Sequence, residues 1–411
     1  MRIALVSMHT SPAAVPGSGD AGGMNVVVSE AARALAGRGH EVVVVTRASS
    51  AIAAGEYALG AAGGAVPGGA GPGNAHADPA LIALPAGALG LGKGELPTVL
   101  PEFAAGLRDL GPFDAVHAHY WLSGIAARHA TADRGTRVAM TFHTLAGQKN
   151  ARLAPVDAPE PEARVAAERE LTAGCFVVAG SRSELGGVEE FAGTPGLGSA
   201  VVHPGVDTGL FRPRRLRQAA GARDPLRVTV LGRVQPLKGQ DLALRAAGAL
   251  ARTDPGLFAR TEWVIAGEPT PGAEDYAAGL RELAERLGIA PSVRFLPAQS
   301  RRQAAALLAS SALVLVPSHS ETFGLTALEA AACGVPVIAS AHTGLLEAVP
   351  HGIAGELLPD REPGTWAAAI AALLGDDRRR ARLGASARTH AEAHDWGAHA
   401  EALERIYEGL A

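Results

Sequence analysis

The stretch that decides the fold lies at residues 312–340 and reads ALVLVPSHSETFGLTALEAAACGVPVIAS. It begins with an apolar run, "ALVLVP", that has the length of a strand buried on both faces. A helix is expected next, at residues 325–333, because Gly334 and then Pro336 follow it and would end it. The stretch closes on a second apolar run, "VPVIAS". This order of strand, helix and strand is typical of a parallel sheet covered by helices.

The same alternation continues along the chain. Further strand-like runs are "RIALVSM", "HEVVVVT", "AVHAH", "RVAMTFH", "CFVVAGS", "AVVHPG", "LRVTVLG", "EWVIAGE" and "VRFLP". We therefore predict an α/β fold with two Rossmann-like, doubly wound domains, the first at residues 1–205 and the second at 206–394. The last helix, at about 395–411, has no strand after it and is expected to pack on the first domain. Residues 51–79, rich in Gly, Ala and Pro, are expected to be a surface loop without a helix or strand.

The composition limits the classes of function. A length of 411 residues with 47% hydrophobic residues allows two or three large domains. The formal net charge of −4 gives no basic field for nucleic acid. No apolar run approaches the roughly 20 residues of a membrane-spanning helix, and the N-terminal run is too short for a secretory signal. Because Cys175 and Cys333 are far apart in sequence, neither a disulfide framework nor a zinc site is expected, which favours a cytoplasmic protein.

Two cations follow a strand in the second half of the chain. Arg233 and Lys238 lie in "GRVQPLKG", directly after the strand expected at "LRVTVLG", with Pro236 and Gly239 to shape the loop. Exposed Arg and Lys are usually only solvated, but ligands of open α/β sheets bind at the carboxyl ends of strands. A pyrophosphate carries about two negative charges that Mg²⁺ or paired cations must offset. Because the sequence has no D-x-D triplet, the two cations offer a metal-free way to bind a diphosphate.

The opening stretch itself carries two acids. Glu321 lies in the loop before the expected helix, and Glu329 lies more than one turn inside it. Carboxylates accept hydrogen bonds from vicinal hydroxyls, and the amides of residues 323–325 would lie at the positive end of the helix. This arrangement fits a nucleotide sugar, with one acid for the sugar and one for the ribose. The alternative is that Glu321 is a solvated loop acid or a cap and that Glu329 pairs with an arginine.

The first half of the chain offers weaker signals. Gly22 and Gly23 precede a helix start at which Asn25 could be the cap, so backbone N–H groups there could bind an anion. A loop that merely turns the chain is an equally good interpretation. A dehydrogenase is less favoured, because no acidic residue follows the second strand in the place that would bind a ribose. Histidines follow two strands, in "HAHYWLSG" (117–124) and "TFHTLAGQKN" (141–150), where they are as often structural as functional. No catalytic triad order and no metal-binding spacing supports a hydrolase.

Taken together, these motifs resemble glycosyltransferase family 4, whose members are retaining enzymes with the GT-B fold. The likeness rests on "ETFGLTALE", "GRVQPLKG" and "HPGVD" and covers nearly the whole chain. It is greatest to the subgroup that transfers N-acetylglucosamine from UDP-N-acetylglucosamine to 1D-myo-inositol 3-phosphate in actinobacterial mycothiol biosynthesis. The stretches of this chain that resemble the subgroup are "SMHTSP", "GDAGGMNV", "HYWLSG", "HTLAGQKN", "GKGELPT" and "FLPAQS". The resemblance implies two domains that face each other across a cleft.

The resemblance also implies a role for individual residues on the donor side. Arg233 and Lys238 would bind the diphosphate, Glu329 the ribose, Glu321 the sugar hydroxyls, and the backbone of Gln299 the uracil. The implied donor-binding residues are Gly23, Arg233, Lys238, Gln299, Glu321, Phe323, Gly324, Leu325 and Glu329. The implied catalytic residues are His143, Arg233, Lys238 and Glu321. No cofactor or metal would be required, although a non-essential Mg²⁺ stays open.

On the acceptor side, the resemblance implies a pocket for an anionic group. The implied acceptor-binding residues are Asn25, Lys93, Tyr120, Thr144 and Arg164. Two cations with two hydroxyls suit a dianionic phosphate, and they would also suit a carboxylate. The implied partners are therefore a nucleotide sugar and a small anionic acceptor, without nucleic acid and without a membrane span, and a homodimer stays open.

The chain departs from the subgroup at several places. Thr343 stands in "AHTGLLEAV" where the subgroup tends to have the first of two glycines, Glu268 stands in "AGEPTPG" where a glycine is more usual, and the 51–79 segment is unlike the subgroup. The first two departures leave a natural-product glycosyltransferase open, one that uses a GDP- or dTDP-sugar on another anionic or zwitterionic acceptor. A non-catalytic nucleotide-sugar sensor and a nucleotide-sugar epimerase are further alternatives.

Overall fold

The computed structural model describes residues 1–60, 65–67, 78–151, 159–214 and 225–410. The chain forms two compact units. The N-terminal domain comprises Met1–Ala14, Gly23–Gly205 and Trp396–Ala411, and the C-terminal domain comprises Val15–Gly22 and Val206–Asp395. The short segment Val15–Gly22 thus groups with the second domain, where the Gly17 carbonyl accepts a hydrogen bond from the Glu268 amide at 3.0 Å.

The N-terminal domain is built on one sheet with the strand order β4-β3-β5-β2-β1-β6-β7-β8-β9. All its neighbours pair in parallel except β3, which is antiparallel to β4 and β5. The strands are β1 (Arg2–Val6), β2 (Glu41–Arg47), β3 (Gly55–Leu59), β4 (Ala65–Pro67), β5 (Ala80–Leu84), β6 (Ala115–His119), β7 (Val138–Thr141), β8 (Phe176–Ala179) and β9 (Ser199–Val201).

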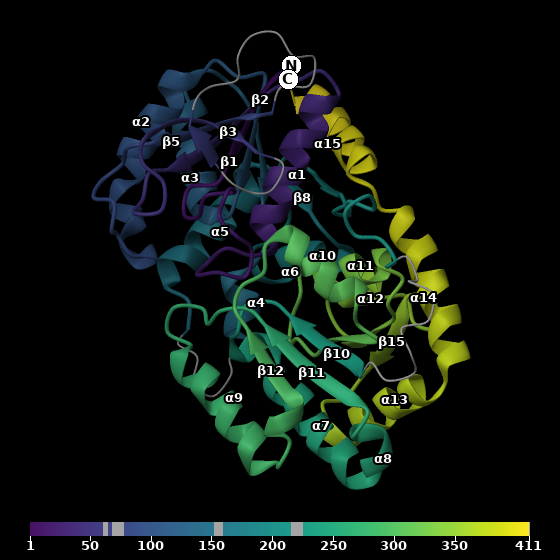
Figure 1. The fold of residues 1–411 in the computed structure, drawn as a ribbon. Coiled ribbons are helices and arrows are strands. Elements are labelled where there is room, and N and C mark those ends of the chain that lie inside the picture. Colours follow the sequence, from purple (N-terminus) through teal and green to yellow (C-terminus); the bar gives the residue numbers. More distant parts are fainter. Residues whose placement is uncertain (61–64, 68–77, 152–158, 215–224, 411) are drawn as a thin grey trace. The chain divides into compact units, whose positions relative to one another are not determined.

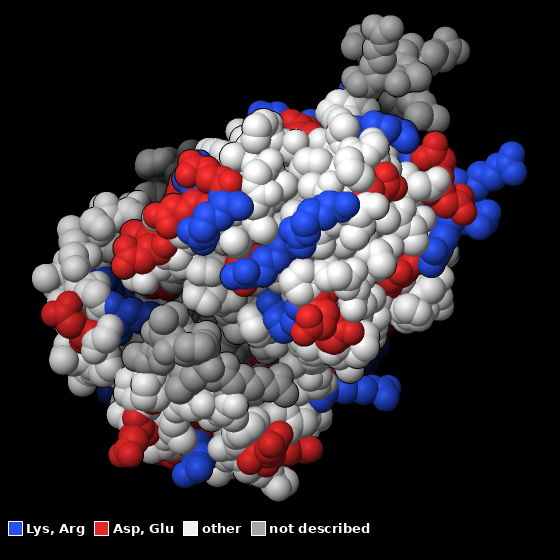
Figure 2. All heavy atoms as spheres, turned by 90° about the horizontal axis from the view of Figure 1, so that it is seen from below, with Lys and Arg blue, Asp and Glu red and all other residues white. Residues whose placement is uncertain are grey.

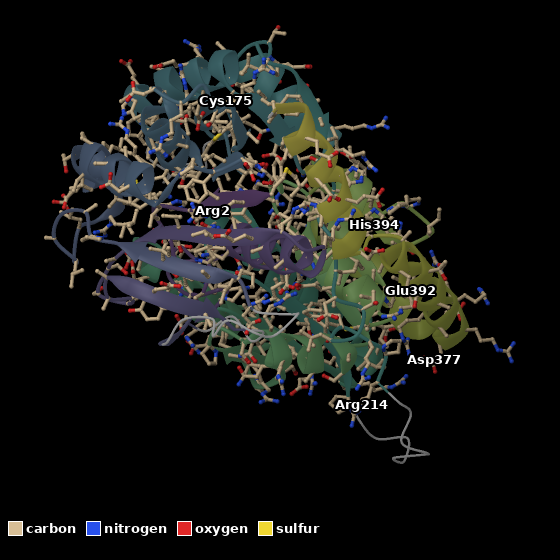
Figure 3. The ribbon with its side chains drawn as sticks, turned by 90° about the horizontal axis from the view of Figure 1, so that it is seen from above. Arg2, Cys175, Arg214, Asp377, Glu392 and His394 are labelled. Carbon is tan, nitrogen blue, oxygen red and sulfur yellow. The ribbon has the colours of Figure 1, made fainter. Side chains whose placement is uncertain are left out.

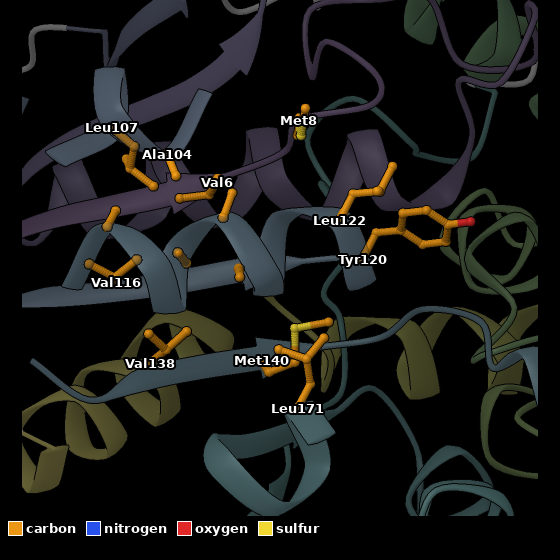
Figure 4. Close-up of a cluster of buried hydrophobic side chains, with 14 of the residues drawn as sticks. Val6, Met8, Ala104, Leu107, Val116, Tyr120, Leu122, Val138, Met140 and Leu171 are labelled. Carbon is orange, nitrogen blue, oxygen red and sulfur yellow. The ribbon is translucent and has the colours of Figure 1, made fainter. Parts of the chain in front are cut away.

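Helices cover both faces of this sheet (Figure 1). They are α1 (Gly23–Gly37), η1 (Lys93–Val99), α2 (Leu100–Leu110), α3 (Trp121–Thr131), α4 (Ala146–Asn150), α5 (Glu162–Gly174), α6 (Arg182–Phe191) and α15 (Trp396–Leu410). On one face, Val6 and Met140 of the strands pack with Leu107 of α2 and Leu171 of α5 (Figure 4). On the other face, the last helix, α15, packs beside α1 over Leu5 and its neighbours.

The C-terminal domain has a fully parallel sheet with the order β12-β11-β10-β13-β14-β15. Its strands are β10 (Leu226–Leu231), β11 (Thr261–Ala266), β12 (Val293–Leu296), β13 (Leu313–Val316), β14 (Val337–Ser340) and β15 (Gly355–Leu358). Its helices are η2 (Pro236–Lys238), α7 (Gln240–Thr253), α8 (Pro255–Phe258), α9 (Glu274–Arg286), η3 (Ala290–Ser292), α10 (Arg301–Ala309), α11 (Leu325–Ala332), α12 (Leu345–Ala348), α13 (Pro363–Gly375) and α14 (Asp377–Glu392).

The two faces of this second sheet are covered by different helices. Helices α7, α9 and α13 bury one set of strand residues, and α10, α11, α12 and α14 bury the other set. The prediction of two doubly wound parallel-sheet domains is therefore confirmed. The cleft between them stays a prediction.

Some local expectations were wrong. Residues 51–79 contain β3 and β4, so they are not a loop without elements, although 61–64 and 68–77 lie outside the described residues. Helix α11 ends at Ala332, one residue before the expected end, because Cys333 is its C-cap. Asn25 does not cap α1. The helix begins at Gly23, and the side-chain amide of Asn25 donates through Nδ2 to Thr10 Oγ1 at 3.0 Å and to the Ser11 carbonyl at 2.8 Å.

The face of the molecule in Figure 2 and the two cysteines can be compared with what the composition predicts. Lys and Arg alternate with Asp and Glu over the face that Figure 2 shows, without a field of one sign. Cys175, labelled in Figure 3, and Cys333 are both free and buried, and burial raises the pKa of each thiol to about 12. No helix in the described part of the chain combines the length and the apolarity that crossing a membrane requires.

Candidate active site

The donor-side cations lie on the connection between β10 and α7. Gly239 follows η2 with a φ of +68°, and a Cβ there would lie 2.2 Å from the Pro317 carbonyl oxygen. Only glycine therefore lets the β10 connection approach the end of β13 so closely. This approach places Lys238 Nζ 2.7 Å from Glu321 Oε1, with both side chains partly buried. Two residues that are far apart in sequence, both expected to bind the donor, are in direct contact.

Glu321 is held by its own loop as well. The Ser318 hydroxyl donates a hydrogen bond to Glu321 Oε1 at 2.7 Å. Gly324 adopts a φ of +119°, and a Cβ there would lie 2.8 Å from Leu345 Cδ2, so the turn into α11 needs glycine. Phe323 is buried, with its ring 6.0 Å from that of His394. The Phe323 ring is therefore part of the core of the C-terminal domain.

Glu329 is buried inside α11 and forms an ion pair with Arg301 of α10. The Arg301 guanidinium also lies 4.7 Å from the centroid of the Phe211 ring, which is fully buried. The alternative that Glu329 pairs with an arginine is thus what the structure has. The ion pair restrains the Glu329 carboxylate.

Arg233 is the second donor-side cation. Its Nη1 lies 3.9 Å from Asp20 Oδ1, and a Cβ on Gly22 would lie 3.4 Å from its Nε. Burial lowers the pKa of Arg233, while the charges of Asp20 and Glu321 act in the opposite direction. An arginine stays charged despite such burial, so Arg233 brings a poorly hydrated positive charge to the glycine-rich segment.

Two further residues lie at the ends of β11 and β12. Gln299 lies between β12 and α10, and its side-chain amide donates to the Pro297 carbonyl at 2.8 Å. Glu268, which departs from the subgroup, lies after β11, where its carbonyl accepts from the Val234 amide at 2.8 Å. Its backbone thus joins the connections that follow β10 and β11.

In the N-terminal domain, the four residues expected to bind the acceptor phosphate come together around one ring. Lys93 Nζ lies 4.8 Å and Arg164 Cζ 4.7 Å from the centroid of Tyr120. Arg164 Nη2 donates to Thr144 Oγ1 at 3.0 Å and to the Thr144 carbonyl at 2.8 Å. These four residues, called the acceptor cluster below, come from four separate parts of the chain. Their side chains could bind a phosphate with two cations and two hydroxyls.

The sequence did not indicate the two acids that hold Arg164. Arg164 is 3% exposed, its Nε donates to Glu168 Oε1 at 2.7 Å, and its Nη1 lies 2.8 Å from Glu160 Oε2. Burial opposes the charge of Arg164, but Tyr120, Glu168 and Glu160 outweigh it and raise its pKa. Each acid lies four residues from Arg164 within or beside α5, which is the helical spacing that could have revealed them.

His143 lies after β7 in an unusual conformation. Its φ is +60°, and its Nε2 lies 2.9 Å from Nδ1 of His119 at the end of β6. Burial lowers the pKa of His143 to about 3, so its ring is neutral near pH 7. Tyr120 also has a positive φ, of 74°. Strained conformations cluster at active sites and ligand-binding turns, so both residues stay candidates for the site at the ends of β6 and β7.

The described residues contain no group of three or more His, Cys, Asp or Glu side chains arranged to hold a metal ion. The expected site residues therefore divide into two sets. The C-terminal domain holds Arg233, Lys238, Gln299, Glu321, Phe323, Gly324, Leu325 and Glu329, and the N-terminal domain holds Gly23, Asn25, Lys93, Tyr120, His143, Thr144 and Arg164. Their roles in binding and catalysis stay predictions.

Comparison with known proteins now decides the family. The model "Glycosyltransferase Family 4" matches residues 21–210, and "Glycosyl transferases group 1" matches residues 214–390. A Salinispora arenicola protein named D-inositol 3-phosphate glycosyltransferase is 41% identical over 423 residues, covering 99% of this chain and 91% of that protein. The chain belongs to glycosyltransferase family 4. A Mycobacterium bovis protein of the same name is 39% identical over 430 residues, covering 99% of this chain and 82% of that protein.

Solved structures agree with this family 4 assignment. Sucrose-phosphate synthase from Thermosynechococcus elongatus superposes with a TM-score of 0.83 at 26% identity, over 100% of this chain and 99% of that one. Anabaena HepE, solved with UDP and glucose, has a TM-score of 0.74 at 19% identity over 99% of both chains, and shows the fold alone. This family 4 enzyme is a nucleotide-sugar-dependent hexosyltransferase with the GT-B fold.

Proposed function

We propose that this family 4 enzyme transfers N-acetylglucosamine from UDP-N-acetylglucosamine to a hydroxyl of 1D-myo-inositol 3-phosphate, with retention of the anomeric configuration. The observation that carries the proposal is the acceptor cluster of Lys93, Tyr120, Thr144 and Arg164. Two cations around one phenol make a site for a small dianion. The names of relatives about 40% identical over nearly the whole chain support inositol phosphate as that dianion.

On the donor side, we propose that basic side chains neutralise the charge of the diphosphate. Arg233 and Lys238 bind the diphosphate and stabilise the negative charge that grows as it leaves. No metal is required, so the initial rate should survive EDTA. Lysine has three N–H donors, so Lys238 can hold Glu321 and a phosphate oxygen together. Glu321 then binds hydroxyls of the transferred sugar, and Glu329 binds the ribose.

The proposed chemical step is a substitution on one face of the sugar. The bond between the anomeric carbon and the diphosphate oxygen breaks, and a bond to the acceptor oxygen forms on the same face. An oxygen of the departing diphosphate takes the acceptor proton. The lowered pKa of His143, about 3, supports this assignment, because an imidazole with that pKa is too weak a base for the step. His143 instead contributes a hydrogen bond near the transferred sugar.

A second candidate rests on Thr343 and Glu268. Both depart from the glycine that is usual in the subgroup, and the Thr343 hydroxyl accepts a hydrogen bond from the Glu321 amide. A change this close to a sugar-binding acid favours a different nucleotide sugar, as in a natural-product glycosyltransferase with another anionic acceptor.

One experiment separates the two candidates. The purified protein is incubated with UDP-N-acetylglucosamine and 1D-myo-inositol 3-phosphate, and in parallel with UDP-glucose, GDP-mannose and dTDP-glucose, and products are read by mass spectrometry. The proposal expects one N-acetylglucosaminyl-inositol phosphate, whose anomeric proton shows the coupling of an α-glycoside in the NMR spectrum. Unphosphorylated inositol is the matched control and should give little product. Turnover with a GDP- or dTDP-sugar, but not with UDP-N-acetylglucosamine, would favour the second candidate.

A further inference from the structure

Thr343 adopts a backbone conformation that its side chain disfavours. It lies between β14 and α12 with a φ of +51° and is 8% exposed. A β-branched residue rarely adopts a left-handed conformation, because its branched Cβ crowds the backbone. The conformation persists only where the surroundings impose it. Something at this turn must therefore compensate for the unfavourable conformation.

The Thr343 hydroxyl makes two hydrogen bonds, as the donor in one and the acceptor in the other. It donates to the His342 carbonyl at 2.8 Å, so its oxygen accepts from the Glu321 amide, 3.0 Å away. The next residue, Gly344, donates its amide to the Glu321 carbonyl at 3.0 Å. A Cβ on Gly344 would lie 2.2 Å from the Thr322 carbonyl oxygen, so a side chain at this position would clash with the loop. The backbone of Glu321 is thus held on both sides.

The carboxylate of Glu321 is held independently of its backbone. Lys238 Nζ and Ser318 Oγ both donate to Oε1, each at 2.7 Å. A side chain anchored only at its tip can still move when the loop beneath it moves. The bond from the Glu321 amide to Thr343 removes that freedom, because it ties the loop to the turn after β14. Preorganised groups bind a ligand without the cost of ordering them.

We propose that Thr343 is a positioning residue for recognition of the donor sugar, acting through its hydroxyl on the backbone of Glu321. This inference rests on the proposed function in one respect, the assignment of the transferred sugar to Glu321. It predicts that the hydroxyl matters for the sugar and not for the nucleotide, because Arg233 and Lys238 would bind the diphosphate without it. It also predicts that the branched methyl group of Thr343 contributes nothing.

Three variants separate the hydroxyl from the backbone conformation. Thr343→Val keeps the shape and removes the hydroxyl. Thr343→Ser keeps the hydroxyl and removes the methyl group. Thr343→Gly removes both the hydroxyl and the methyl group, and glycine adopts the left-handed conformation without strain. Melting temperatures of all three are measured first, and Thr343→Gly is expected to be as stable as Thr343→Val or more so.

Calorimetric titration with UDP-N-acetylglucosamine and with UDP is the first readout. Thr343→Val and Thr343→Gly should each weaken binding of the nucleotide sugar about five- to tenfold, the loss expected for one hydrogen bond, and leave UDP binding within about twofold. Thr343→Ser should bind both ligands as the unchanged protein does. Equal losses for both ligands in Thr343→Val, or no loss for the sugar, would overturn the proposal.

The second readout needs no ligand. Hydrogen exchange at the Glu321 amide should be faster in Thr343→Val and Thr343→Gly than in the unchanged protein and in Thr343→Ser. If the unchanged protein does not bind UDP-N-acetylglucosamine, the proposed donor is wrong, and the titration is repeated with the nucleotide sugar that gives turnover. The exchange measurement still tests Thr343 in that case, since unchanged exchange at Glu321 in Thr343→Val would refute the positioning role.

Discussion

Lys238 and Glu321 meet although 83 residues separate them, and so do Arg301 and Glu329 across 28 residues. Each acid that the sequence suggested for sugar binding therefore already forms an ion pair with a basic side chain. The two pairs differ in exposure, since the side chains of Lys238 and Glu321 are 23% and 17% exposed, whereas those of Arg301 and Glu329 are 10% and 9% exposed. The Lys238–Glu321 pair is thus the more accessible to a ligand, and the Arg301 guanidinium restrains the Glu329 carboxylate.

This contrast predicts the effect of removing the Lys238 charge. Lys238→Met keeps the length of the side chain and should lower kcat about 10²- to 10³-fold with saturating donor, because the departing diphosphate loses a charged donor. The matched control is Lys93→Met in the acceptor cluster, which should mainly raise the KM for inositol phosphate. Steady-state kinetics with both substrates varied measures the two effects. Near-normal turnover in Lys238→Met would remove its role at the leaving group.

The element that positions Lys238 is the junction between η2 and α7. Gly239 at this junction has a φ of +68° and would place a Cβ 2.2 Å from the Pro317 carbonyl oxygen. Gly288, after α9, has a nearly equal φ of +70° but nothing within 4 Å of the same position. The two glycines therefore separate the cost of the left-handed conformation from the cost of close approach.

Substitution by alanine tests that separation. Gly288→Ala should lower the free energy of unfolding by about 1 to 2 kcal/mol, the cost of a left-handed alanine. Gly239→Ala should lower it by more, because the backbone at Pro317 must also move, and should raise the donor KM by shifting Lys238. Urea denaturation and donor kinetics are the measurements. Equal losses of stability in the two variants, with an unchanged donor KM, would contradict this account of the junction.

Strands found from the sequence differ in a physical way from β3 and β15, which were missed; β5, which reads "ALIAL", was missed although it is apolar. Central strands such as β2 and β13 are buried on both faces and read as continuous apolar runs. By contrast, β3 and β15 lie toward the edges of their sheets, are only partly buried, and read as "GEYAL" and "GELL". Short strands of this kind are formed by pairing with neighbours, which leaves little pattern in the sequence. The candidate site residues that follow the central strands were predicted from the sequence, but the two acids that bind Arg164 were not.

At the scale of the whole molecule, the N-terminal domain buries a group of neutral histidines. Burial lowers the pKa of His117 and of His143 to about 3, that of His399 to about 4, and that of His119 well below its usual value. For His117, the Tyr407 hydroxyl at 2.7 Å and Thr141 Oγ1 at 2.9 Å satisfy the two ring nitrogens without a charge. Burial raises the pKa of the nearby Glu184 to about 7, so this acid is partly protonated near neutral pH.

These shifts predict how stability depends on pH. Between about pH 4 and 6.5 the unfolded chain protonates these histidines while the folded domain does not, so stability falls as the pH falls below 6.5. Glu184 acts in the opposite direction, because the folded state binds its proton at a higher pH than the unfolded chain does. As the pH falls from 6.5 to 5.5, each histidine should lower the free energy of unfolding by about 1 kcal/mol, and Glu184 should raise it by about 1 kcal/mol. The net decrease in the free energy of unfolding is then about 2 to 3 kcal/mol.

Hydrogen exchange of the amides in β6 and β7, corrected for the intrinsic effect of pH on exchange, measures this loss where the histidines lie. The matched variant is Glu184→Gln, which removes the opposing contribution, so protection in β6 and β7 should then fall more steeply over the same interval. Exchange in β10 and β11 of the C-terminal domain is the internal control and should change less, since these histidines all belong to the other domain. Protection of β6 and β7 that stayed constant from pH 6.5 to 5.5 would mean that the histidines accept protons in the folded state.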